Sequence, residues 1–178
     1  PDGAGPYWAP TVAADRFVVA PTAVRWHLLA STWLDLPGRP GLIGNRGPDG
    51  KPYAALSDSL YSTAAPLDRR LLLQVLADLP PGAGVDATEA SRAMIWRRPR
   101  WSVRLQPEPV SNLLAEGHAL GVMGRGAIAT PTRGLLADGA AEDVVAAMTK
   151  VLPKPIDHFL LQADLTVIVP GPLERELS

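Results

Sequence analysis

The sequence contains no cysteine among its 178 residues. Disulfide bonds and thiolate metal sites are therefore excluded, and the absence agrees with a reducing compartment, so we expect a cytoplasmic location. The only three histidines, His27, His118 and His158, stand far apart in the sequence and lack the spacing of a metal-binding motif. We therefore predict that the chain holds no metal and no cofactor.

The chain also lacks an excess of charge of either sign. Its 17 basic and 18 acidic side chains nearly cancel, so only a local basic cluster could indicate a nucleic-acid partner. No long apolar run is present either. The longest apolar stretch, residues 159–169, is interrupted by Gln162 and Asp164 and is shorter than the roughly 18–20 residues that cross a bilayer. We expect no membrane contact.

The motifs of nucleophilic and phosphate-binding enzymes are missing as well. No serine lies in a Gly-x-Ser-x-Gly turn. The glycine-rich loop 44–52 does not match a phosphate-binding loop, because five residues instead of four separate Gly44 from Gly50. Pro52 also stands where a magnesium-binding hydroxyl is needed. A surface turn explains this loop, and we predict that the chain is not an enzyme and has no catalytic residues.

The residues that are present favour a packed domain of short elements. Hydrophobic residues make up 47% of the chain, and 19 prolines with 16 glycines favour many elements joined by turns. Residues 1–20 are predicted to be a loop, or a short strand around 16–19. Apolar residues at helical spacing predict helices that begin at Pro21, at Pro66 and after a cap at Asp86 or Thr88. Further helices are expected over 109–120, 131–137 and 143–151. Trp26 and Trp33 should face the core.

The segment 113–136 indicates the most specific architecture. Its apolar helix ends at Gly121, a short strand turns at 124–126, a second strand follows, and Pro131 begins another helix. Three helices followed by a hairpin is the order of a winged helix-turn-helix domain. The sequence thus predicts an α+β, mainly α, fold in three parts. These are an N-terminal helical region (1–63), a winged-helix domain (64–138) and a C-terminal helix plus strand (139–178).

An arginine-rich connection joins the second and third helices of this expected domain. It comprises Arg97, Arg98, Arg100 and Arg104, with no acidic side chain among them. Trp96, expected to face the core from the second helix, and Trp101 could also stack on a base or a guanidinium. We expect Arg125 at the wing tip and Arg133 in the next helix near the groove edges. The alternative is a solvated loop whose tryptophans enter the core and whose arginines pair with local acids.

The third helix offers little for reading a DNA sequence. Ser111 and Asn112 are its candidate base readers, but it has no lysine or arginine, and Glu116 would repel phosphate. We therefore expect duplex or forked DNA to be bound through phosphates with low sequence specificity. A winged helix that binds a protein partner and no DNA is the alternative.

Residues 159–169 resemble a single strand that needs a sheet partner to satisfy its backbone. No later segment could supply that partner, and the chain begins at Pro1 without a methionine. We therefore interpret the chain as a fragment of a longer protein. The strand should then lie at a sheet edge, or pair with residues 16–19 or with a second molecule.

Several segments, in this order, resemble the helicase-associated proteins of actinobacteria, which share a domain named for the N-terminal region of XPB-type helicases. The segments are Trp26 with Trp33, PGLIG (40–44), LPPG (79–82), WRRPR (96–100), GVMGRGA (121–127), LLQADLT (160–166) and PGPL (170–173). The resemblance covers most of the chain, and its last two segments are the most specific. It implies a winged-helix middle region, a DNA-linked role, and an XPB-like domain that is truncated here. Helicase activity is not implied, because no Walker motif is present.

Overall fold

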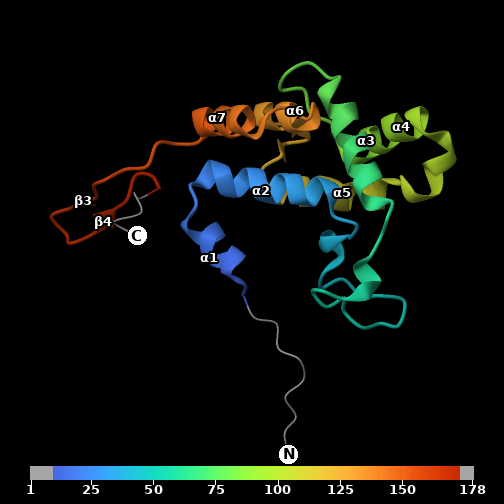
Figure 1. The fold of residues 1–178 in the computed structure, drawn as a ribbon, viewed down its shortest axis with the longest axis horizontal. Helices are drawn as coiled ribbons and strands as arrows, with labels where there is room; N and C mark the ends of the chain where they lie inside the picture. The colour runs from blue at the N-terminus through green and yellow to red at the C-terminus, as the bar shows by residue number, and fades with distance from the viewer. Residues whose placement is uncertain (1–9, 173–178) are drawn as a thin grey trace, which may run out of the picture.

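The structure is a computed structural model that describes residues 10–172 (Figure 1). Its α-helices are α1 (Val12–Val19), α2 (Thr22–Asp35), α3 (Ala65–Ala77), α4 (Ala87–Arg97), α5 (Pro107–Ala119), α6 (Thr130–Leu136) and α7 (Ala141–Val151). Three 3₁₀ turns are η1 (Pro40–Leu42), η2 (Asp58–Leu60) and η3 (Pro99–Arg104). The strands are β1 (Met123–Gly124), β2 (Ala127–Ile128), β3 (Leu160–Leu161) and β4 (Val167–Ile168). The prediction of a mainly helical α+β chain is confirmed.

Local sequence signals account for where the helices begin. At the start of α4 the Asp86 carboxylate accepts from the Glu89 N–H at 2.8 Å, and the Glu89 carboxylate accepts from the Asp86 N–H at 3.1 Å. This reciprocal capping decides between the two caps that the sequence allowed, in favour of Asp86. Proline lies in the first turn of α3, α5 and α6, where its missing N–H has no helical partner to lose. The expected loop or strand at 16–19 is instead the end of α1.

A single hydrophobic core joins α2 to the later helices. Trp26 and Trp33 of α2 are 7% and 4% exposed, which confirms their prediction as core residues. They share this core with Leu72 and Leu76 of α3 and with Val144 of α7. The helix α2 packs on both α3 and α7, as Figure 1 shows. The helices α2 and α7 are thus built onto the same core as the segment between them.

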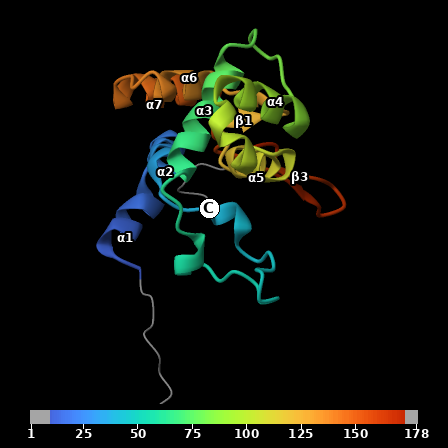
Figure 2. The ribbon, with the colours of Figure 1, turned by 90° about the vertical axis from the view of Figure 1, so that its right-hand side faces the viewer.

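The helices α3, α4 and α5 are grouped together with β1 beside them (Figure 2). The strands β1 and β2 pair antiparallel, with Met123 opposite Ile128 and Gly124 opposite Ala127. The two turn residues, Arg125 and Gly126, have φ values of +51° and +75°, which is the backbone of a tight two-residue hairpin. The expected order of three helices, a hairpin and a helix is therefore present, and no strand occurs within the described residues 66–120.

The single strand predicted over residues 159–169 is wrong, because this segment folds back on itself. Strands β3 and β4 pair antiparallel, with Leu160 opposite Ile168. In the turn, the Asp164 carboxylate accepts from the Thr166 N–H at 3.0 Å, and Leu165 has a φ of +65°. The polar residues that interrupt the apolar run therefore form a turn. The partner of the first strand is the second half of the same segment, and α1 takes no part in this pairing.

The outermost residues of two predicted parts, 1–9 of the N-terminal region and 173–178 of the C-terminal segment, lie outside the described residues. Across the described range, no helix has the length and apolar character needed to cross a membrane.

Candidate nucleic-acid interface

The predicted arginine cluster divides into side chains with internal partners and side chains without them. Arg104 has the strongest internal partner: its Nε donates to the two carboxylate oxygens of Asp68 at 2.8 and 3.1 Å. Its guanidinium also lies 4.0 Å from the centre of the Trp101 ring. Burial raises the pKa of Asp68, and the hydrogen bond and charge of Arg104 act against that rise. The Arg104 guanidinium is therefore already bound to partners within the protein.

Two further arginines from the predicted set also have internal partners. Arg97 forms an exposed ion pair with Asp78, the residue that follows α3. Arg133 donates to the carbonyl oxygens of Ala77 at 2.6 Å and Leu79 at 3.3 Å. The Ala77 carbonyl belongs to the last residue of α3, where helical acceptors lack backbone partners, and Leu79 lies two residues further along the chain. Arg133 therefore fastens α6 to the end of α3.

Three arginines keep their charge directed to solvent: Arg98, Arg100 and Arg125. None of them has an ion-pair partner within residues 10–172. Arg98 lies 5.7 Å from the centre of the Trp101 ring. Arg125 lies at the turn of the β1–β2 hairpin. We call these three residues the free arginines. The first two line a shallow hollow together with Trp101.

Trp96 is 86% exposed, so the prediction that it faces the core is wrong. Ala90 and Met94 of the same helix are fully buried. Because successive helical residues are about 100° apart, Trp96 lies roughly 200° around the helix from Met94 and points outward. Arg92, one turn earlier, is exposed on the same side of α4. The helix thus presents a large aromatic surface next to the arginine-rich connection.

The alternative of a packed and internally paired loop therefore holds for part of this connection, and DNA contact by the remaining residues stays a prediction. Trp101 is half-buried and stacks on arginine, and Arg97 and Arg104 pair with local acids. Trp96 and two of the free arginines remain open to solvent. These exposed groups form the candidate surface.

Glu116 points into the protein, away from the surface where the sequence placed it. Its Oε2 accepts from Trp33 Nε1 at 2.7 Å and from Arg69 Nη2 at 3.1 Å. Its Oε1 accepts from the Gly41 N–H at 2.8 Å. The side chain is 6% exposed and that of Arg69 is 0% exposed. The predicted repulsion between Glu116 and phosphate is therefore removed, because this carboxylate is already neutralised inside the fold.

The outward side of α5 is small and mostly uncharged. Ser111, Ala115 and His118 are exposed there, and Asn112 is half-buried. Val110 and Gly117 are buried on the opposite side. The predicted base readers are thus accessible, but a short hydroxyl and a half-buried amide provide few contacts to base edges.

Sequence reasoning missed the buried Arg69, although one signal could have revealed it. Ala65, Arg69, Leu72 and Leu76 follow the spacing of one helical face. An arginine in the middle of an apolar face requires an internal acid, because an unpaired buried charge is very costly. The sequence alone does not show which acid provides that partner.

No group of three metal-ligating side chains occurs in the described part of the chain. No protein-family model, curated protein or solved structure significantly matches this sequence.

Proposed function

We propose that this chain is a non-catalytic DNA-binding module of a helicase-associated protein, in which α3, α4, α5 and the β1–β2 hairpin form a winged helix. The observation that carries the proposal is the exposed Trp96 close in sequence to exposed arginines that have no ion-pair partner within the described residues. An aromatic platform with nearby guanidinium groups suits unpaired bases and phosphates together. A second observation supports the winged-helix form. The Val85 N–H donates to the Gly126 carbonyl at 3.2 Å, so the chain before α4 lies along the hairpin turn.

The small number of free arginines predicts a weak dependence of binding on salt. If Arg98, Arg100 and Arg125 each neutralise one phosphate, the log–log slope of affinity against salt on duplex DNA should be about −2.7. Replacing any one of them with alanine should weaken binding to every sequence equally and reduce the slope by about one. Fluorescence anisotropy with labelled duplexes measures both the affinity and its slope. The salt concentration should run from roughly 50 to 200 mM, a range over which phosphate-dependent affinity changes strongly.

Lys150→Ala provides the matched control for these arginine variants. Lys150 is an exposed basic residue on α7, away from α4 in Figure 1, and its removal should leave the slope unchanged. Equal losses from this control and the arginine variants would show that only overall charge matters. Strong discrimination between duplex sequences that disappears in Ser111→Ala or Asn112→Ala would contradict the phosphate-based mode.

Trp96 predicts a preference for DNA with unpaired bases. Trp96→Ala should weaken binding to a forked or single-stranded oligonucleotide by roughly 5- to 150-fold, since stacking on one base contributes about 1–3 kcal/mol. Binding to a blunt duplex should change little, and Trp96→Phe should retain most of the affinity. The melting temperature should not fall, because the side chain is 86% exposed. Equal losses on forked and blunt DNA would exclude stacking as the cause.

A protein-interaction role is the second candidate, and the β3–β4 hairpin favours it. Phe159, Leu161 and Leu165 are 58%, 62% and 81% exposed, and the remaining apolar residues of this hairpin are exposed as well. Clustered apolar groups of this kind are typical of surfaces that a partner covers. Absence of DNA binding at low salt would favour this candidate over the first.

A further inference from the structure

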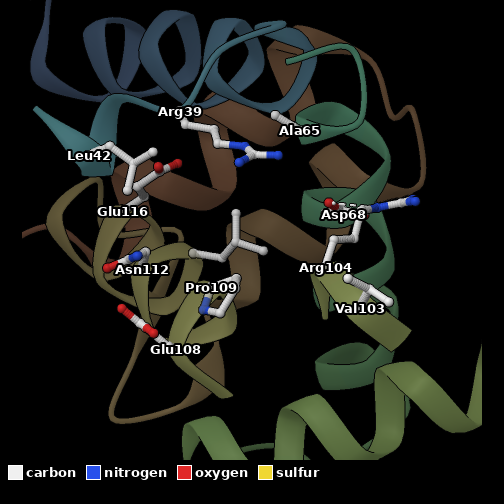
Figure 3. Close-up of a pocket in the computed structure, with 11 residues that line it drawn as sticks. Arg39, Leu42, Ala65, Asp68, Val103, Arg104, Glu108, Pro109, Asn112 and Glu116 are labelled. Carbon is white, nitrogen blue, oxygen red and sulfur yellow. Dashed lines mark hydrogen bonds and ion pairs between the residues drawn. The ribbon is translucent and has the colours of Figure 1, made fainter. Parts of the chain in front are cut away.

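A pocket of about 450 Å³ lies between η1, α3, η3 and the first half of α5 (Figure 3). Its volume falls within the roughly 300–1,000 Å³ that is typical of small-ligand sites. Trp96, Arg98, Arg100 and Arg125 do not line it. It therefore lies apart from the exposed groups of the candidate surface, although the predicted DNA-binding residues Arg104 and Asn112 line it.

One wall of the pocket is fixed by the Glu116 network. Glu116 connects α5 to Trp33 and to Gly41 of η1 through the hydrogen bonds described above. A Cβ at Gly41 would lie 2.7 Å from Glu116 Oε1, so only glycine allows this approach. The wall is therefore formed before any ligand arrives, and the carboxylate within it is already paired.

The opposite wall is fixed by the Asp68–Arg104 pair. Trp101, outside the pocket, supports Arg104 by stacking on its guanidinium. The charges of this wall also neutralise each other.

Arg39 supplies a cation of the pocket lining whose guanidinium has no hydrogen bond or ion pair within residues 10–172, although its charge acts against the rise that burial causes in the pKa of Asp68. The backbone of Arg39 is held, because its N–H donates to Leu60 at 2.9 Å and its carbonyl accepts from Leu42 at 3.1 Å. Its guanidinium extends into the pocket (Figure 3) and makes no hydrogen bond or ion pair within residues 10–172. Glu108, the remaining acid of the lining, lies at the far edge from this guanidinium (Figure 3). The pocket therefore contains a guanidinium whose N–H donors are unused. Two parallel N–H groups of a guanidinium can donate to the two oxygens of one carboxylate.

The rest of the lining is largely apolar. Leu42, Val103, Pro109 and Leu113 contribute to it. Val103 is 88% exposed, so a ligand that covers it would remove apolar surface from water and gain about 25 cal/mol per Å². A ligand of the right shape thus has one anionic group and an aliphatic body.

We propose that this pocket binds a carboxylate carried on a short branched aliphatic body, with the carboxylate on the Arg39 guanidinium and the aliphatic part against Leu113 and Pro109. A free aliphatic carboxylic acid and the last residue of a peptide chain both have this chemistry. The pocket volume accommodates either one.

N-acetyl-leucine is the first probe, because it carries a carboxylate and a branched aliphatic side chain on one small molecule and has no second charge. Titrated into the full chain and followed by ¹H–¹⁵N NMR, it should shift the Arg39 Nε–H signal and the amides of Asn112 and Leu113. N-acetyl-leucinamide lacks the charge and N-acetyl-glycine lacks the aliphatic body, and each should bind at least about tenfold more weakly, as expected for losing a charge-assisted hydrogen bond or a buried side chain. A Gly-Gly-Gly-Leu peptide distinguishes the two sources. Binding of this peptide with a free but not an amidated C-terminus would identify the end of a peptide chain, and binding of the small acid alone would identify a free carboxylic acid.

Arg39→Gln is the decisive variant, and Arg46→Gln is its control. Arg39→Gln should weaken N-acetyl-leucine binding about tenfold or more. It should lower the melting temperature little, because the exposed guanidinium makes no hydrogen bond within the described residues and acts on Asp68 only through its charge. Arg46, exposed in the nearby loop and hydrogen-bonded to Gly50, does not line the pocket, and its variant should bind normally. Equal binding of the acid and the amide, binding unaffected by Arg39→Gln, or no shifts with any probe would each overturn the proposal.

Discussion

Replacing Glu116 with alanine is expected to cost about 3–5 kcal/mol of the free energy of unfolding, the loss typical of breaking a buried ion pair from one side. The variant leaves Arg69 charged and fully buried without its carboxylate. It also removes the acceptor of the Trp33 Nε1–H and the Gly41 N–H. Three donors from α2, η1 and α3 lose their partner together, which explains why the expected loss is so large.

Urea denaturation followed by circular dichroism measures this loss. Glu108→Ala, on the exposed first turn of the same helix, is the control and should change stability by less than about 0.5 kcal/mol. The double variant Arg69→Met with Glu116→Leu should recover only part of the loss, because it removes the unpaired charge but leaves the Trp33 Nε1–H and the Gly41 N–H without their acceptor. It also removes the donor to the carbonyls of Trp33, Leu36 and Gly38. A loss below about 1 kcal/mol for Glu116→Ala would contradict the network as described.

The second large effect is expected at Gly126 in the β1–β2 hairpin. Gly126 has a φ of +75°, and a Cβ there would overlap the backbone of Val85. Gly126→Ala should therefore destabilise the protein by at least about 2 kcal/mol, from the left-handed backbone and from displacing the loop segment that precedes α4. The same change should weaken any DNA contact that Arg125 makes, because this residue shares the turn.

Gly124→Ala is the control on the same hairpin. A Cβ at Gly124 would meet no atom within 4 Å, so the loss should stay near the roughly 0.5 kcal/mol of an ordinary surface change. Thermal melts of the two variants make the comparison directly. Equal stability of both variants would mean that Val85 and the hairpin turn do not contact each other in solution.

Sequence reasoning succeeded where a local pattern determines local structure. Apolar spacing and proline positions predicted the helices from α2 onward, and the capping residues limited the start of α4 to Asp86 or Thr88. The hairpin between α5 and α6 was predicted because its turn requires glycine. These features depend on residues within a few positions of each other, so one sequence is enough to show them.

The sequence alone could not show which charged groups meet. Arg69 and Glu116 are 47 residues apart, and the Asp68–Arg104 pair spans 36. Such pairs form only when the core brings α3, η3 and α5 together. The distance between the paired residues along the sequence does not reveal that they meet. The assembly of the core also decides which arginines of the cluster have partners within the protein and which remain free.

By itself, the sequence determined the helices from α2 onward, the hairpin after α5 and the presence of a local basic cluster. Each of these depends on residues that lie close together in the sequence. The tertiary structure alone decided that Glu116 faces inward, that Trp96 faces outward and that Arg39 points into a pocket. The physical reason is that burial is a property of the assembled core: the same helix exposes or hides a side chain according to which neighbours cover it. For this protein the candidate surface and the pocket both follow from that assembly.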